Sequence, residues 1–124
     1  MSGDGKKALV VDDSLTVRIY HSSLLKNLGF EVDTAENGME ALEMAIKNKY
    51  DLFLTDINMP VMDGYEFVRK LRKMDEYRLT PVVFITTLNS EEDKNKALIS
   101  GGTLFIVKPI DLKILEKIIN SITS

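Results

Sequence analysis

Short apolar runs alternate along the chain with longer stretches in which apolar residues recur every three or four positions. Four of the runs are almost wholly apolar up to their carboxyl ends, namely 8–11, 52–56, 82–85 and 104–107. Runs of this kind are typical of strands buried on both faces of a parallel sheet. A fifth run, 31–35, alternates between polar and apolar residues, which predicts a strand nearer the sheet edge.

The stretches after these strands carry the spacing of amphipathic helices. Val17, His21, Leu24 and Leu28 recur at helical spacing, and Gly29 ends that helix. The other helices are predicted from their capping residues and apolar faces. The capping residues are Asn37 with Glu40, Ser90 with Asp93, and Asp111. The apolar faces are formed by Leu42, Ala45 and Ile46, by Val68, Leu71 and Met74, and by Leu115, Ile118, Ile119 and Ile122. Five successive strand–helix units predict a doubly wound α/β domain, because right-handed crossovers place helices on both faces of a five-stranded parallel sheet.

Charged and polar residues stand where four of the predicted strands end. They are Asp12 and Asp13 at the first strand, Asp56 at the third, Thr86 at the fourth and Lys108 at the fifth. In open α/β sheets, functional groups gather at the carboxyl ends of the strands. Three carboxylates in one place repel one another unless a cation lies between them, so the cluster predicts a divalent metal. The lysine beside the cluster predicts a phosphoryl group.

Composition and charge exclude several functions. A chain of 124 residues with 44% hydrophobic content is one ordinary domain, and a net charge of −3 without a basic block argues against nucleic-acid binding. The absence of cysteine excludes disulfides, thiolate metal sites and cysteine catalysis, and it fits a reducing compartment. No apolar run reaches membrane-spanning length. We therefore expect a cytoplasmic, monomeric domain over 6–124, preceded by a short flexible tail over 1–5.

Together these residues resemble the receiver domain of bacterial response regulators, of the single-domain, CheY-like type. The resemblance rests on Asp12-Asp13, on Asp56 within Thr-Asp-Ile-Asn-Met-Pro-Val-Met-Asp-Gly, on Thr86 and on Lys108-Pro109, each in order at its own strand end. It covers the chain from Lys6 to the last helix. It implies a flavodoxin-like sheet with the strand order 2-1-3-4-5 and a function in two-component signal transduction.

The resemblance also implies a role for each residue of the cluster. Asp56 is the phosphoacceptor, which takes a phosphoryl group from a sensor histidine kinase or a phosphotransfer protein and forms an acyl phosphate. Lys108 and Thr86 contact the phosphoryl oxygens, and a cis peptide bond before Pro109 directs Lys108. The implied ligands for Mg²⁺ or Mn²⁺ are Asp12, Asp13, Asp56 and the backbone carbonyl of Asn58.

A receiver of this type is a switch rather than an enzyme with a separate substrate, and it catalyses only its own phosphorylation and dephosphorylation. The resemblance implies that phosphorylation draws the Thr86 hydroxyl toward the phosphoryl group and that the Phe105 ring turns into the vacated space. The fourth helix, fifth strand and fifth helix then control a downstream output protein. A flagellar motor switch in chemotaxis is one candidate, although Phe105 and Ile57 stand where that branch has tyrosine and often tryptophan.

Two other classes share parts of this pattern. A flavin mononucleotide-binding protein needs a first strand–helix turn that cradles a phosphate, and the carboxylates of Asp12 and Asp13 disfavour one there. An aspartate-nucleophile phosphatase or phosphotransferase of similar fold spaces its two first-strand aspartates by one residue, whereas these two are adjacent. Taken singly, Asp13 also suits the cap of the first helix, and Asp63 before Gly64 suits a turn. His21 is interpreted as a packed or half-exposed residue far from the strand ends.

Overall fold

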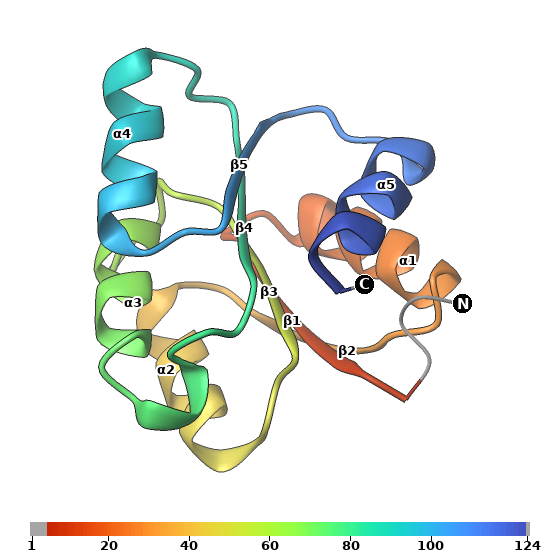
Figure 1. The fold of residues 1–124 in the computed structure, drawn as a ribbon, viewed down its shortest axis with the longest axis horizontal. Coiled ribbons are helices and arrows are strands. Elements are labelled where there is room, and N and C mark those ends of the chain that lie inside the picture. The colour runs from red at the N-terminus through yellow and green to blue at the C-terminus, as the bar shows by residue number, and fades with distance from the viewer. Residues whose placement is uncertain (1–4, 124) are drawn as a thin grey trace.

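Five strands form one parallel sheet (Figure 1), namely β1 (Lys7–Val11), β2 (Glu31–Ala35), β3 (Leu52–Thr55), β4 (Val82–Thr86) and β5 (Leu104–Val107). Their order is β2-β1-β3-β4-β5, which confirms the predicted fold class and strand order. The structure is a computed structural model that describes residues 5–123. The tail expected over 1–5 therefore lies outside the described residues, apart from Gly5.

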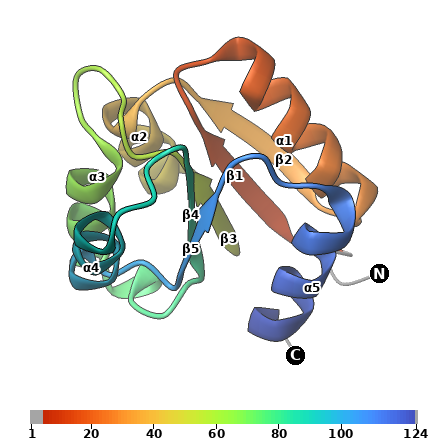
Figure 2. The same ribbon diagram turned by 90° about the horizontal axis from the view of Figure 1, so that it is seen from above.

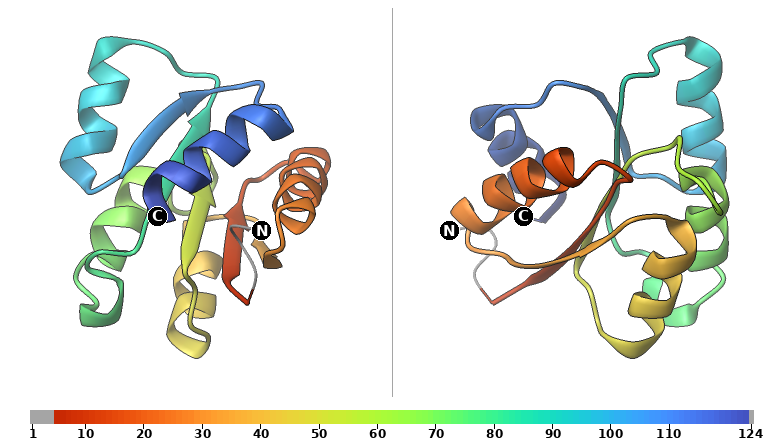
Figure 3. Two further views of the ribbon diagram at one scale, coloured as in Figure 1. Left: turned by 45° about the vertical axis from the view of Figure 1, so that its right-hand side comes forward. Right: turned by 180° about the vertical axis from the view of Figure 1, so that it is seen from behind.

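Helices cover both faces of this sheet. They are α1 (Leu15–Asn27), α2 (Gly38–Lys47), α3 (Gly64–Leu71), α4 (Glu91–Ser100) and α5 (Leu112–Thr123), with a short 3-10 helix, η1 (Asp75–Tyr77), after α3. Figures 1 and 2 show α2, α3 and α4 on one face and α1 and α5 on the other, and the two views in Figure 3 agree. Within residues 5–123, no helix is long and apolar enough to cross a membrane.

The sheet separates two apolar cores, because successive strand residues point to opposite faces. Leu9, Phe53 and Phe84 pack toward α2, α3 and α4, whereas Val10 and Leu54 pack toward α1 and α5. The central strands β1, β3 and β4 are buried almost throughout, which explains their continuous apolar runs. Strand β5 is predicted to be buried on both faces, but it is only half-buried. The reason is that it forms the second edge of the sheet.

Side-chain oxygens cap the helices at the positions that the sequence indicates. The caps that accept the backbone N–H three residues later are Asn37, Asp63, Ser90 and Asp111. At α1 the cap is Ser14 rather than Asp13, so Asp13 is left without a capping role. The apolar face of α2 is rotated from the predicted one. Ala45 is buried as predicted, but Ile46 is 69% exposed, and the helix buries Ala41 in addition.

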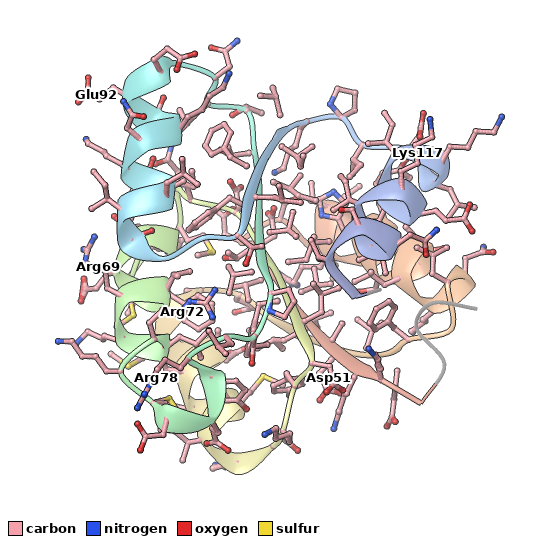
Figure 4. The ribbon with its side chains drawn as sticks, viewed as in Figure 1. Asp51, Arg69, Arg72, Arg78, Glu92 and Lys117 are labelled. Atoms are coloured by element: carbon pink, nitrogen blue, oxygen red, sulfur yellow. The ribbon has the colours of Figure 1, made fainter. Side chains whose placement is uncertain are left out.

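Arg72, directly after α3, joins that helix to two other segments. Its guanidinium donates hydrogen bonds to the carbonyl oxygens of Gly101 (2.8 and 2.9 Å), Tyr77 (2.7 Å) and Thr80 (2.6 Å). Figure 4 shows Arg72 directed inward from α3, whereas Arg69 points away from the protein. Burial lowers the pKa of Arg72 because the charged form loses water, and the carbonyl oxygens replace that water.

Replacing Arg72 with leucine is expected to lower the free energy of unfolding by about 2–4 kcal/mol, since three carbonyl oxygens lose their donor. Urea unfolding followed by circular dichroism measures this change. Arg69→Leu on the same helix is the matched control, and we expect it to change stability by less than about 0.5 kcal/mol. Equal effects of the two substitutions would show that the hydrogen bonds of Arg72 do not stabilise the fold.

Candidate functional site

Asp12, Asp13 and Asp56 meet at the carboxyl ends of β1 and β3. These strands pair with Val11 opposite Thr55, so the residues that follow them are neighbours. One carboxylate oxygen from each aspartate lies within 4.8 Å of the other two. Asp12 is 2% exposed, Asp56 is partly buried and Asp13 is exposed. The predicted acidic cluster is therefore present, and it opens to solvent on the side of Asp13.

Lys108 lies across two of the three carboxylates. Its Nζ donates to Oδ2 of Asp12 at 3.0 Å and to Oδ2 of Asp56 at 3.1 Å. Burial by itself lowers the pKa of Lys108, but the hydrogen bonds and charges of Asp12 and Asp56 outweigh it and raise the pKa above its ordinary value. The sequence predicts that a metal alone neutralises the cluster. In the structure, Lys108 already neutralises part of it.

Backbone groups fix the buried carboxylates. Oδ1 of Asp12 accepts from the N–H of Ser14 at 2.9 Å, and Oδ1 of Asp56 accepts from the N–H of Ile57 at 2.7 Å. The carbonyl oxygen of Asp12 accepts from Nη1 of Arg18 at 2.7 Å. In each aspartate, one carboxylate oxygen is therefore held by the backbone, while the other, Oδ2, faces Lys108. The sequence analysis missed Arg18, because nothing in the local pattern distinguishes it from a surface arginine.

The loop between β3 and α3 has little conformational freedom. A Cβ atom at Gly64 would lie inside contact distance of the carbonyl oxygen of Asp56, so glycine is required there. Val61 has a φ of 70°, a region that a β-branched residue rarely enters. Strained backbone of this kind is concentrated near functional sites. Asn58, whose carbonyl is a predicted metal ligand, lies exposed in this loop two residues after Asp56.

Thr86 and Phe105 lie on adjacent strands, and Phe105 is opposite Phe84, two residues before Thr86 on β4. Thr86 is buried at the end of β4, and its Oγ1 accepts from the N–H of Leu88 at 3.2 Å. Its carbonyl oxygen accepts from the N–H of Lys108 at 2.8 Å. Phe105 is half-buried and packs against the core on the side of α2, α3 and α4. The peptide bond between Lys108 and Pro109 is cis, as the resemblance implied.

His21 lies closer to the acidic cluster than the sequence suggested. It is buried, which is one of the two predicted alternatives, and it lines an apolar cavity of about 210 Å³ together with Lys108 and Tyr20. Burial and the charge of Lys108 lower the pKa of His21, and they outweigh Asp12 and Asp56, which act in the opposite direction. The error arises because the segment after β5 lies against α1 and brings Lys108 beside His21, which sequence distance does not reveal.

The donor set of the cluster suits a hard divalent cation. All its side-chain donors are carboxylate oxygens, which Mg²⁺ and Mn²⁺ prefer, and Mg²⁺ typically takes one or two carboxylates, water and phosphate oxygens. The exposed side at Asp13 is open to solvent, so water can complete the coordination. The cluster can therefore hold a divalent cation, which would compete with Lys108 for the carboxylates of Asp12 and Asp56.

The fold and the site define a doubly wound α/β domain with an acidic pocket and a lysine at the carboxyl edge of its sheet. Residues 8–120 match the response regulator receiver domain, and the chain belongs to this family. Chemotaxis protein CheY4 of Vibrio cholerae is 40% identical with a TM-score of 0.89, over 94% of this chain and 98% of that one. The receiver domain of sensor histidine kinase PA1611 from Pseudomonas aeruginosa PAO1, with a magnesium ion coordinated in its active site cleft, is 28% identical with a TM-score of 0.89, over 97% and 99% of the chains.

Curated relatives place the same domain in larger proteins. The gliding motility regulatory protein of Myxococcus xanthus is 36% identical over 118 residues, which are 94% of this chain but 15% of that protein. Two further relatives are also longer than this chain, which spans 54% of the length of one and 9% of the length of the other. Receiver domains belong to two-component systems and accept phosphoryl groups from sensor histidine kinases. The relatives thus include proteins of chemotaxis and motility.

Replacing Lys108 with methionine is expected to raise the affinity for Mg²⁺ and to destabilise the metal-free protein. The substitution leaves Asp12 and Asp56 without their counter-ion, and removing one partner of a buried ion pair costs about 3–5 kcal/mol. Isothermal titration calorimetry measures the affinity, and urea unfolding measures the stability. Lys117→Met, on the outer side of α5 (Figure 4), is the control and should change neither. Unchanged Mg²⁺ affinity in Lys108→Met would contradict the competition between the lysine and the cation.

Replacing His21 with glutamine is expected to make stability depend less on pH below neutrality. The pKa of folded His21 is lowered from 6.5, so the unfolded chain binds the proton more readily. The stability contributed by neutral His21 is therefore present above pH 6.5 and is lost as the pH falls toward the folded pKa. Urea unfolding between about pH 7.5 and 5.5 measures the slope. Equal slopes for the parent and the variant would refute this assignment.

Proposed function

We propose that this chain is the phosphoacceptor switch of a two-component pathway and that Asp56 accepts the phosphoryl group. The donor is the phosphohistidine of a sensor kinase or phosphotransfer protein. The observation that carries the proposal is the position of Lys108, whose ammonium bridges Asp12 and Asp56 beside the exposed Asp13. A positive group is thus already placed beside a carboxylate nucleophile, and phosphoryl transfer depends mainly on such positioning and charge stabilisation.

The two oxygens of Asp56 differ in their surroundings. Oδ1 accepts the N–H of Ile57, whereas Oδ2 faces the ammonium of Lys108. We therefore assign Oδ2 as the attacking atom. Its bond to phosphorus forms as the bond between phosphorus and the histidine nitrogen of the donor breaks, and the histidine leaves with its electron pair. Lys108 then transfers its hydrogen bond from the carboxylate to a phosphoryl oxygen.

The remaining cluster residues would hold the cation. Asp12, Asp13 and Asp56, with the backbone carbonyl of Asn58, are the proposed ligands for Mg²⁺ or Mn²⁺. When bound, the cation supplies positive charge that offsets the repulsion between the carboxylates and the phosphoryl oxygens. The all-oxygen donor set supports this assignment, as does the magnesium ion in the similar receiver of PA1611.

Thr86 and Phe105 form the proposed switch. The hydroxyl of Thr86 would leave its hydrogen bond with Leu88 and donate to a phosphoryl oxygen, and the half-buried Phe105 on the neighbouring strand would turn into the space released. The change is a shift between two populations, because the phosphoryl group binds one arrangement better. The output surface is the face of α4, β5 and α5, on which Ile99 and Leu98 are exposed apolar residues.

The output partner is proposed from the relatives and the surface together. Relatives named for chemotaxis and gliding motility support a role in controlling movement, and a flagellar motor switch is one candidate partner. Phe105 has no hydroxyl through which it can signal to such a partner. We therefore expect the partner to recognise the apolar side chains of the surface formed by α4, β5 and α5.

Asp56→Asn is expected to abolish covalent labelling by a small acyl-phosphate donor in the presence of Mg²⁺, because the amide keeps the shape but loses the nucleophile. Intact-protein mass spectrometry detects the added phosphoryl group. Asp51→Asn is the matched control, since Asp51 directly precedes β3 at the opposite end of the sheet (Figure 4) and should leave labelling unchanged.

The same reaction separates the switch from an aspartate-nucleophile phosphatase. A switch accumulates one phosphoryl group per chain, whereas a phosphatase releases phosphate continuously from an excess of donor. Continuous turnover by the parent protein would support the enzyme instead. Labelling of Asp56→Asn at another residue would refute the assignment of the phosphoacceptor.

A further inference from the structure

Arg18 is a buried cation that the proposed phosphoryl transfer does not use. It projects from the first half of α1 and is 8% exposed. Its Nη1 donates to the carbonyl oxygen of Asp12 at 2.7 Å, and its Nη2 lies 3.6 Å from the carboxylate of Glu36. Glu36 is 66% exposed, so solvent weakens that ion pair. The buried hydrogen bond to Asp12 is therefore the stronger of the two contacts.

The bond from Arg18 acts on the peptide unit that joins two of the acidic residues. The carbonyl group of Asp12 and the N–H group of Asp13 belong to one planar peptide, so fixing the carbonyl also fixes the direction in which Asp13 leaves it. The contacts from Ser14 and Lys108 hold the carboxylate of Asp12. The turn closed by Ser14 also restricts the following peptide, and Arg18 is the side chain that holds the carbonyl oxygen of this peptide.

We propose that Arg18 is a positioning residue for the divalent cation site. It orients the peptide between Asp12 and Asp13 so that both carboxylates reach the same cation. The inference rests on the proposed function only in requiring that the acidic cluster binds a divalent cation. Outer groups that orient metal ligands commonly change metal affinity by about 10- to 100-fold when they are removed.

The charge of Arg18 has the opposite effect, because a guanidinium near the cluster repels a cation. Two substitutions separate the charge from the positioning. Arg18→Lys keeps the charge but loses the planar guanidinium that reaches the carbonyl of Asp12. Arg18→Met loses both. Positioning predicts that Arg18→Lys binds Mg²⁺ more weakly than the parent, whereas a charge effect alone predicts parent-like binding for Arg18→Lys and tighter binding for Arg18→Met.

Calorimetric titration of the folded, unphosphorylated protein with Mg²⁺ tests the proposal. We expect Arg18→Lys to weaken the affinity about tenfold or more, and Arg18→Met to weaken it less because the repulsion is also removed. Parent-like affinity in Arg18→Lys overturns the proposal, and so does tighter binding in Arg18→Met. If Arg18→Met does not fold, as shown by circular dichroism, Arg18→Lys alone decides.

Glu36→Gln is the matched control, because it removes the exposed ion pair and leaves the bond between Arg18 and Asp12 in place. It should bind Mg²⁺ as the parent does. Weakening equal to that of Arg18→Lys would assign the effect to the ion pair and overturn the proposal. Labelling by the acyl-phosphate donor separates this result from the proposed function. A parent that is never labelled contradicts the proposed function and not the role of Arg18.

Discussion

The two ion pairs of Lys108 are the constraint on which the site depends, because they join the ends of three strands. Asp12 follows β1, Asp56 follows β3 and Lys108 follows β5. Strands β1 and β3 are adjacent, but β5 is separated from β3 by β4, so the chain after β5 must return across the end of β4. The N–H of Lys108 makes this crossing by donating to the carbonyl oxygen of Thr86. Breaking one partner of such a buried pair is costly, so the site also holds the carboxyl edge of the sheet together.

The sequence predicts the parts of this protein that depend on local chemistry. Central strands buried on both faces appear as continuous apolar runs. Capping side chains such as Asn37 and Ser90 indicate where helices begin. The sequence also brings Asp12, Asp13 and Asp56 to one edge, because parallel strands end together. These features need only the period of the pattern and the direction of the strands.

What the sequence does not predict depends on how helices and loops lie against the finished sheet. Ile46 is exposed because of the way α2 is rotated about its axis. Apolar residues within a single turn do not determine that rotation. The position of His21 beside Lys108 follows from the way the segment after β5 lies against α1. The bond of Arg18 to a backbone carbonyl carries no signal in the sequence, since any residue can supply that carbonyl. The pairing of Lys108 with Asp12 and Asp56 is not predicted for a related reason, because it depends on how the segment after β5 returns across the end of β4.

The two halves of the molecule differ in how firmly they are held. Helix α1 is joined by side chains to both ends of the site, through Arg18 to the carbonyl of Asp12 and through the Tyr20 hydroxyl to the carbonyl of Ile110 at 2.7 Å. Helix α4, in contrast, buries only Ala97 and Ser100 among its ten residues, and β5 beside it is a half-buried edge strand. Segments with little buried surface rearrange at the lowest free energy. The side of α4 and β5 is therefore the one that can rearrange at the lower free energy, whereas α1 is joined to the acidic cluster through Arg18.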